Sequence, residues 1–289
     1  MNIEVVADIR ADLGESPVWD ERYGQLWWVD ALAGRLYRRD VATGAIVRLE
    51  LSHRLGGLAL GEVDLVAMLD TEVIAVPRDP TVEAVPRRVF RTGAPLHDCG
   101  VAPDGAIWVG TLSPDQERAE GGLLRLGKAG AVPQGLVDGY RMPNGISWTA
   151  DGGSVHVVDS LRHAIFRSRF ADGREVAREP WVIGAEADGL PDGVCADLEG
   201  GLWVAYWGTG RVVRYDTAGR PTCVIEVPAR YTTSCCFGGP GLRQLFITSA
   251  RYDSGAEETE AGALFVAEVD VPGLPVPTAW RDVRDDLAD

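Results

Sequence analysis

Four oxygen-bearing side chains recur along this chain at intervals close to multiples of one length. They are Glu15, Asp98, Asn144 and Asp192, separated by 83, 46 and 48 residues. Carboxylate and carboxamide oxygens are the donors that hard divalent cations prefer. If the fold brings these positions into one narrow space, the carboxylates would repel one another and lose hydration. A bound cation resolves both problems, so the pattern indicates a metal site.

The elements that carry these residues form a repeat. After each of the four comes an apolar strand ending in a turn, then a second strand rich in aromatic and β-branched residues. A third strand follows in which apolar and polar residues alternate, the pattern of a half-buried strand. The second-strand positions Trp108, Val155, Trp203 and Phe246 are 47, 48 and 43 residues apart.

The repeat length predicts the fold. Trp27 and Trp108 are 81 residues apart, which is two units, with a degenerate copy at residues 58–69 between them. Six units of about 40–48 residues match the blade length of a β-propeller. A β-sandwich, the competing all-β fold, would not repeat a unit of several strands. We therefore predict an all-β, six-bladed β-propeller with the metal site at the top of its central channel.

The whole chain, residues 1–289, is predicted to be a single propeller domain. Residues 3–7 have the composition of a strand but lie outside the first repeat. A ring of sheets is closed by tying its two ends together, which removes free sheet edges. We expect this N-terminal strand to complete the last blade beside residues 264–269. The acidic stretch 254–262 is expected to be a surface loop within that blade.

The composition and the net charge of the chain limit the classes of binding partner that we expect. The formal charge of −15 and the pI near 4.7 disfavour nucleic acid and anionic membranes. No apolar run is long enough to span a bilayer, and the N-terminus lacks a signal-peptide pattern, so a cytoplasmic location is the default expectation. Five cysteines without a Cys-x-x-Cys pair argue against a disulfide framework or a structural zinc site. We expect a small-molecule substrate and a monomer or weak homo-oligomer.

Several segments resemble the senescence marker protein/regucalcin/gluconolactonase family of sugar lactone hydrolases. The matching segments are residues 13–19, 142–148, 190–194 and 233–239, and the similarity runs from about residue 8 to residue 270. The resemblance implies a six-bladed propeller, one divalent metal ion held by Glu15, Asn144 and Asp192, and hydrolysis of aldonolactones to aldonic acids. Ca²⁺ is the first expectation for the ion, with Zn, Mg, Mn or Fe as alternatives.

One segment departs from the family pattern. Relatives usually carry Arg-x-Asn-Asp-Gly at the start of the third blade, and the Arg and Asn contact the sugar. Here Asp98 is retained, but Pro95 stands in place of the Arg and His97 in place of the Asn. His97 either hydrogen-bonds a substrate hydroxyl or assists proton transfer, or it simply packs in the channel wall. The identity of the substrate therefore stays open.

The expected mechanism uses the metal as a Lewis acid and Asp192 as general base for the attacking water. A metal-bound hydroxide is the rival base. Asp98 is expected to orient water or substrate without binding the metal itself. Substrate contacts are further expected from Glu117, Arg118 and Arg141, in loops near the same face.

Two other functions remain open beside a metal-dependent lactonase. An esterase or organophosphate-type hydrolase acting on a different ester would be favoured by an apolar pocket. A non-catalytic calcium-binding propeller would bind metal without turning over any lactone. Fold alone cannot choose among them, because propellers carry many functions.

Overall fold

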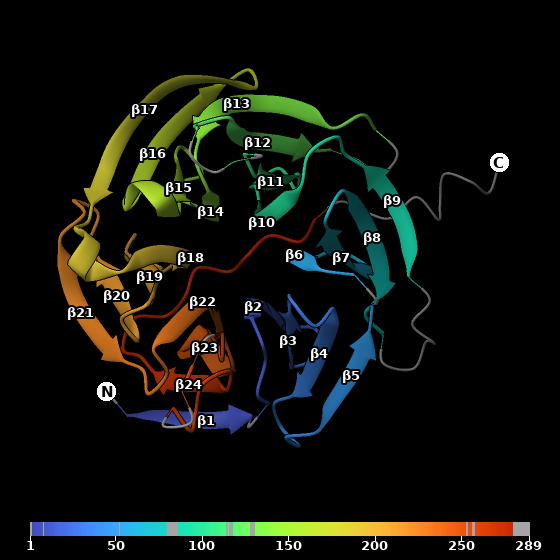
Figure 1. The fold of residues 1–289 in the computed structure, drawn as a ribbon, viewed down its shortest axis with the longest axis vertical. Helices are drawn as coiled ribbons and strands as arrows, with labels where there is room; N and C mark the ends of the chain where they lie inside the picture. The colour runs from blue at the N-terminus through green and yellow to red at the C-terminus, as the bar shows by residue number, and fades with distance from the viewer. Residues whose placement is uncertain are drawn as a thin grey trace.

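The computed structural model shows an all-β protein whose sheets stand in a ring around a common axis (Figure 1). It describes residues 2–7, 9–51, 53–79, 86–113, 115, 118–127, 131–252, 254–255 and 258–279. The helical elements in this part of the chain are single 3-10 turns: η1 (Ser160–Arg162), η2 (Glu186–Asp188) and η3 (Pro240–Leu242). None of them is long or apolar enough to cross a membrane. The predicted propeller-like architecture is confirmed.

Four of the sheets contain four antiparallel strands each, in chain order from the axis outward. The first is β2 (Gly14–Asp20), β3 (Gln25–Asp30), β4 (Arg35–Asp40) and β5 (Ile46–Glu50). The second is β6 (Leu55–Leu60), β7 (Asp64–Leu69), β8 (Glu72–Pro77) and β9 (Arg87–Arg91). The third is β10 (Leu96–Val101), β11 (Ile107–Thr111), β12 (Gly121–Leu126) and β13 (Gln134–Tyr140). The fourth is β14 (Pro143–Trp148), β15 (Val155–Asp159), β16 (Ala164–Ala171) and β17 (Arg174–Ile183).

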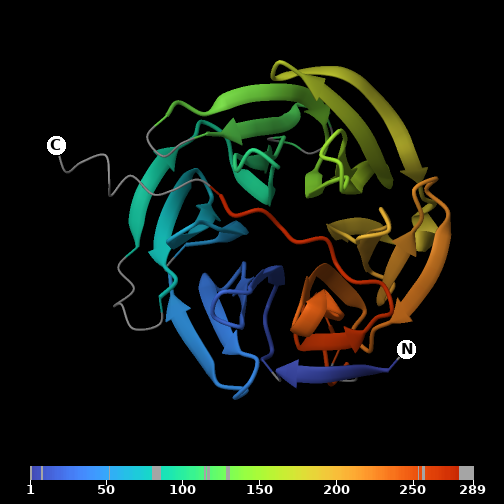
Figure 2. The ribbon, with the colours of Figure 1, turned by 180° about the vertical axis from the view of Figure 1, so that it is seen from behind.

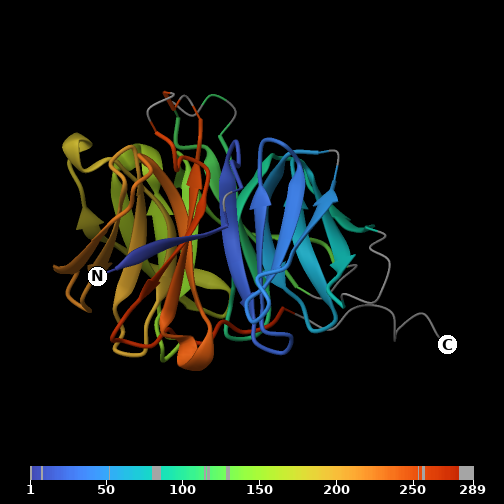
Figure 3. The ribbon, with the colours of Figure 1, turned by 90° about the horizontal axis from the view of Figure 1, so that it is seen from below.

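The remaining eight strands form two groups of four joined by a single bridge. One group is β18 (Leu190–Ala196), β19 (Leu202–Trp207), β20 (Arg211–Tyr215) and β21 (Pro221–Glu226). The other is β22 (Tyr231–Gly238), β23 (Gln244–Ala250), β24 (Leu264–Glu268) and the N-terminal β1 (Ile3–Ala7). The bridge pairs Trp207 of β19 with Tyr231 of β22. In β1, Glu4 lies opposite Val266 of β24, so the first and last strands of the chain share one sheet (Figure 3).

The innermost strands β2, β6, β10, β14, β18 and β22 contact one another in a closed ring. Glycines at the start of these strands allow the close approach. A Cβ atom on Gly145 would lie 2.6 Å from the carbonyl oxygen of Asp192, and one on Gly193 would overlap the Ser234 side chain. Side chains at these positions would push neighbouring sheets apart, so the glycines of the Asn144-Gly145 and Asp192-Gly193 pairs permit strand contact.

Apolar side chains fill the space between adjacent sheets. Trp108 of β11, for example, packs edge-on against Trp148 of β14 and Phe170 of β16, with ring centroids 5.2 and 4.6 Å apart. Each sheet thus buries the alternating apolar positions of its middle strands against the next sheet. This packing gives the rigid frame on which the inner strands sit.

A segment that the sequence did not single out crosses one end of the ring. Residues 271–279, here called the C-terminal strap, run from the last sheet to β6 on the opposite side (Figure 2). The Leu274 N–H donates to the Ala196 carbonyl at 2.9 Å, and the Ala279 N–H donates to the Leu60 carbonyl at 2.7 Å. The strap closes a cavity of about 450 Å³ that is otherwise lined by the innermost strands.

Candidate functional site

The innermost strands share an irregularity near their starts. Strand pairing slips between Glu15 and Val18, Leu96 and Cys99, Pro143 and Ile146, and Pro191 and Val194. Such a bulge takes a residue out of the ladder and re-aims its side chain. Asp98, Asn144 and Asp192 lie within these slips, whereas Glu15 still pairs with Val29 and lies directly before the first slip. The repeat therefore places all four oxygen-bearing side chains at or beside the same kind of irregularity.

These four side chains lie close enough to interact. Glu15, Asp98 and Asn144 line one small pocket together with His97. Burial raises the pKa of Glu15 well above its usual value, and the nearby charges of Asp192 and Asp98 raise that pKa further. Asn144 and Asp192 are each 6% exposed. The structure thus brings together the residues whose spacing suggested a common site.

The carboxylates of the site lie close together, and among the described residues no nearby positive charge lowers their pKa values. Burial raises the pKa of Asp192, the Asp98 charge adds to this, and a hydrogen bond with Asn144 opposes it. Burial also raises the pKa of Asp98 to about 6, although its Oδ1 accepts the Cys99 N–H at 2.7 Å. Asp192 Oδ1 is buried and has no hydrogen-bond partner among the described residues. A buried carboxylate oxygen without a partner is costly, and a cation would stabilise it.

A metal ion fits these residues in donor chemistry. Asn144 Nδ2 donates to Ser160 Oγ at 3.2 Å, which leaves the amide Oδ1 available to a cation. Within the described ranges, no three His, Cys, Asp or Glu side chains cluster in a metal-binding arrangement. The predicted ligand set includes an asparagine, and its two carboxylates together with Asp98 do not form such a cluster.

Ser160 is a site residue that sequence reasoning missed. Its hydroxyl accepts from Asn144 and donates to the Pro191 carbonyl at 2.7 Å. It therefore links β14 to the start of β18 and holds the asparagine amide in one orientation. Ser160 follows a second strand rather than preceding a first strand, so the comparison of repeat positions did not include it.

Buried aspartates at the ends of the second strands fix the segments that lead to the site. Asp30 accepts the backbone N–H groups of Asp12 and Leu13 at 3.0 and 3.1 Å, just before Glu15. Asp159 accepts those of Arg141 and Met142 at 3.0 Å, just before Asn144. Both aspartates are fully buried. Asp30 and Asp159 fix the backbone just before Glu15 and Asn144, and Ser160 fixes the side-chain amide of Asn144.

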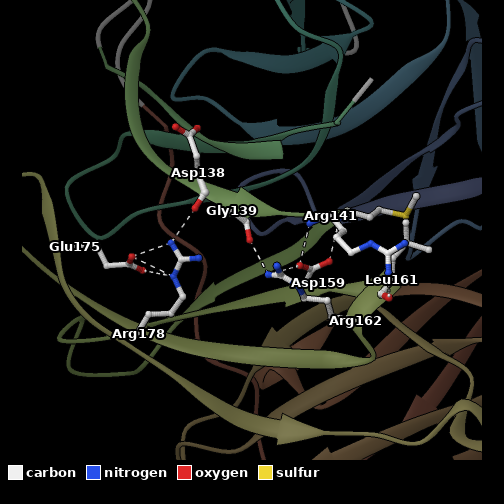
Figure 4. A network of polar contacts seen from close by, with 9 residues as sticks. Asp138, Gly139, Arg141, Asp159, Leu161, Arg162, Glu175 and Arg178 are labelled. Carbon is white, nitrogen blue, oxygen red and sulfur yellow. Dashed lines mark hydrogen bonds and ion pairs between the residues drawn. The ribbon is translucent and has the colours of Figure 1, made fainter. Parts of the chain in front are cut away.

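Figure 4 shows where Arg141 lies. Its backbone N–H meets Asp159, and its guanidinium donates from Nη1 to the Leu161 carbonyl at 3.2 Å. Arg162 also lies beside Asp159, with Nη1 3.3 Å from Oδ2. Arg141 is not among the residues that line the pocket of Glu15 and Asn144. Its contact with substrate stays a prediction.

Arg118 extends from the loop after β11. Its side chain is 74% exposed and lies 3.6 Å from Asp115 and 3.5 Å from Glu120. It does not line the pocket that holds Glu15. Glu117, predicted beside it, lies outside the described residues. The substrate-binding roles of both residues remain predictions.

His97 lies in the pocket with a defined tautomer. Its Nδ1 is 3.1 Å from the Pro143 carbonyl oxygen, which can only accept, so Nδ1 carries the proton. Burial lowers the pKa of His97 to about 4, so the ring is neutral at pH 7. Its Nε2 is then an acceptor, which suits a hydroxyl donor better than an anionic group.

The same pocket contains two residues from the second sheet that the sequence did not suggest. Arg54 and Asp70 both line it. The position in β6 equivalent to the four predicted residues is Gly56, at the pairing slip between Leu55 and Gly57. The repeat at residues 58–69 is degenerate, and Gly56 has no side chain that could bind a ligand. For this reason, comparing the repeats did not point to the second sheet or to Arg54.

Comparison with known proteins agrees with the geometry. Residues 13–251 match the SMP-30/Gluconolactonase/LRE-like region family. The chain is 34% identical to the pentonolactonase XacC of Haloferax volcanii, over 95% of this chain and 97% of that protein. It is 31% identical to the regucalcin of Gallus gallus, over 95% of this chain and 97% of that protein.

A solved structure shares the fold. The calcium-binding protein regucalcin from Agrobacterium tumefaciens superimposes with a TM-score of 0.87 at 26% identity, covering 95% of this chain and 96% of that chain. The relatives named as lactonases are hydrolases. Together with the repeated strand starts and their oxygen-bearing residues, these similarities show that the chain belongs to the SMP-30/gluconolactonase/regucalcin family.

Proposed function

We propose that this protein is a metal-dependent hydrolase that opens a sugar lactone to the corresponding aldonic acid. The observation that carries the proposal is the buried, partnerless Asp192 Oδ1, set among Glu15, Asp98 and Asn144 at the same end of the ring. Lactonase relatives that align over nearly the whole chain support the same chemistry. The substrate partner is a small molecule.

In this proposal Glu15, Asn144 and Asp192 hold one divalent ion. Three oxygen donors favour a hard cation, and Ca²⁺ comes first because regucalcin from Agrobacterium tumefaciens is named a calcium-binding protein. When bound, the ion supplies Lewis-acid polarisation of the lactone carbonyl oxygen. Burial and the neighbouring carboxylate charges raise the pKa values of Glu15 and Asp192, and a bound cation would oppose both effects.

The chain's own residues supply positioning and proton transfer. Asp192 accepts the proton of the attacking water as a new C–O bond forms at the carbonyl carbon. The ring C–O bond then breaks, and Asp192 returns that proton to the leaving oxygen to give the hydroxyl of the aldonic acid. Asp98, held by the Cys99 N–H, orients water or substrate. His97 Nε2 accepts a hydrogen bond from a substrate hydroxyl.

The proposal treats the fold as a six-bladed propeller acting as one domain. The closed ring of six innermost strands supports this count, with the eight-stranded sheet read as two blades joined by the Trp207–Tyr231 bridge. The metal site then lies where the first strands of the blades begin, at one end of the central channel.

The test is an assay of acid release from a panel of five- and six-membered sugar lactones. We expect activity to be lost after chelation, to return with Ca²⁺, and to fall by roughly 10³-fold in kcat in Asp192→Asn. Asp216→Asn, which changes a half-buried, ion-paired aspartate on a distant turn, is the matched control. Circular dichroism and melting curves show that each variant is folded. Full activity after chelation, or in Asp192→Asn, would rule the proposal out.

A second candidate is a calcium-binding protein without turnover. The name of the regucalcin structure favours it, since it describes calcium binding alone. It predicts tight Ca²⁺ binding that depends on Asp192, with no acid released from any lactone in the panel.

A further inference from the structure

Arg54 occupies a distinctive place in the pocket. It lies one residue before β6 and lines the pocket together with Glu15, Asp98 and Asn144. No other lysine or arginine lines this pocket among the described residues. The side chain is exposed, so a ligand in the pocket can reach it.

The Arg54 guanidinium lacks a protein partner. In the part of the chain that the structure describes, it makes no hydrogen bond and no ion pair, although Asp70 lines the same pocket. Two exposed arginines elsewhere are paired: Arg220 lies 2.7 Å from Asp216, and Arg251 lies 2.6 Å from Asp12. Among the described residues, the exposed Arg169 and Arg174 also have no ion pair, but neither lines this pocket. Arg54 therefore keeps all five N–H donors for water or a ligand.

Apart from Arg54, no side chain that lines this pocket carries a positive charge among the described residues. Its other charged side chains are the carboxylates Glu15, Asp70 and Asp98. Besides His97 and Asp98, the third sheet contributes Pro95, Leu96 and Leu112, whose side chains carry no hydrogen-bond donor. With a formal charge of −15, the chain as a whole also repels anions. An anionic ligand group would have to be recognised at Arg54, where a planar guanidinium offers two parallel hydrogen bonds to a carboxylate.

We propose that Arg54 binds an ionised carboxylate of the substrate, and that the protein prefers lactones carrying such a group over neutral sugar lactones. This inference rests on the proposed lactonase function and names its substrate class. The lactone carbonyl lies toward Glu15, Asn144 and Asp192. The carboxylate lies at the side of the pocket formed by the second sheet.

The test compares the five-membered lactones of gluconic and glucaric acid, which differ only in a terminal hydroxymethyl group or carboxylate. We expect the wild-type protein to hydrolyse the glucaric lactone with the higher kcat/KM. Arg54→Gln should lower kcat/KM for that lactone by about 10–100-fold, mainly through KM, because a charge-assisted pair is lost. For the gluconic lactone the change should stay below about 3-fold.

Two variants make the comparison specific. Arg220→Gln removes the same charge from an exposed, ion-paired arginine outside the pocket, and should leave both lactones unaffected. Arg54→Lys keeps the charge but loses the bidentate geometry, and should fall between wild type and Arg54→Gln for the glucaric lactone. Equal wild-type kcat/KM for both lactones, or equal losses for both in Arg54→Gln, would overturn the proposal.

Calorimetric binding of the open-chain acids separates this proposal from the lactonase proposal. Even if no lactone is hydrolysed, tighter binding of glucarate than gluconate that disappears in Arg54→Gln supports the carboxylate site while the lactonase function fails. Equal binding of the two acids by wild type, with lactone hydrolysis intact, leaves the lactonase function standing and sinks the role of Arg54. Equal binding without hydrolysis overturns both.

Discussion

At the residue scale, the types of the site residues set their chemistry, while their neighbours set their orientation. Glu15, Asn144 and Asp192 supply oxygen donors, yet an asparagine amide can turn either end toward a ligand. Ser160 removes that ambiguity by accepting the Nδ2 hydrogen and donating its own to the Pro191 carbonyl. A residue outside the predicted ligand set thus decides whether Asn144 presents oxygen to a cation.

Ser160→Ala should therefore weaken metal binding. Without the hydroxyl, the Asn144 amide loses its fixed orientation, and we expect the Ca²⁺ affinity to fall roughly 10-fold, the usual size of an outer-contact effect. Titration calorimetry of the metal-free protein measures this. Ser254→Ala, which removes an exposed serine that donates to the Arg251 carbonyl, is the control. Equal affinities in Ser160→Ala and wild type would contradict the orienting role.

At the scale of single elements, the starts of the innermost strands do two things at once. Their bulges aim the site residues, and the glycines that follow let the strands touch. Gly193 directly follows Asp192, and a Cβ atom there would overlap the Ser234 side chain on β22. Site geometry and sheet contact are therefore coupled in β18.

Gly193→Ala should lower both stability and activity. Overpacking typically costs about 1–3 kcal/mol, and moving β18 away from β22 would displace Asp192. Chemical unfolding and lactone assays measure the two effects. Gly135→Ala, in the open outer strand β13, meets no atom within 4 Å and should be close to neutral. A fully active and stable Gly193→Ala would show that β18 can shift without disturbing the site.

Strand β15 carries a buried histidine, His156, whose pKa is shifted by its surroundings. His156 is 4% exposed, neither ring nitrogen has a hydrogen-bond partner among the described residues, and the ring lies 4.3 Å from Trp181. Burial lowers the pKa of His156 to about 4. The unfolded chain, with a pKa near 6.5, therefore binds a proton that the folded state does not accept.

This depressed pKa contributes stability above pH 6.5 that is lost as the pH falls toward 4. The loss amounts to about 3 kcal/mol at most. In His156→Phe this contribution is absent, so the difference in unfolding free energy between pH 7 and pH 4.5 should shrink relative to wild type. Urea unfolding at both pH values measures it. An unchanged pH dependence in His156→Phe would show that the imidazole is not the group responsible.

At the scale of the whole molecule, the ring is held by contacts between distant parts of the chain. Strand β1 completes the sheet of β24, and the C-terminal strap joins β18 to β6 across the end of the channel. The strap also lines the 450 Å³ cavity through residues 274–278. The strap connects opposite sides of the ring, whereas the contacts between innermost strands join adjacent sheets.

Truncation after Pro272 should therefore destabilise the protein. It removes three backbone hydrogen bonds, donated by Gly273, Leu274 and Ala279, together with the buried Ala279 side chain. At about 1 kcal/mol each, the hydrogen bonds alone suggest a loss of about 3 kcal/mol and a fall in Tm of roughly 5–10 °C. Truncation after Ala279 keeps the strap and is the control. Equal Tm values for the two truncations would show that the strap is not a tie.

Sequence reasoning found the three inner strands of most sheets but not the outermost ones. Strand β5 is mostly exposed, and β17 and β21 are largely exposed or half-buried along their length. A strand at the rim of the ring buries little on either face, so it shows no period-2 alternation to detect. The inner strands, packed between two neighbours, carry strong patterns because burial acts on them from both sides.

The sequence by itself determined the repeat, the family and the oxygen-bearing residues at the strand starts. These follow from periodicity and residue type, which are local and repeated. Only the tertiary structure decided which side chains share the pocket. Arg54, which lines the pocket, and Ser160, which bonds Asn144, come from positions that no repeat comparison aligns with Glu15 or Asn144. Arg118 and Arg141 do not line that pocket. The distance between side chains on neighbouring sheets depends on how the sheets pack into a closed ring. A local sequence pattern does not determine that distance.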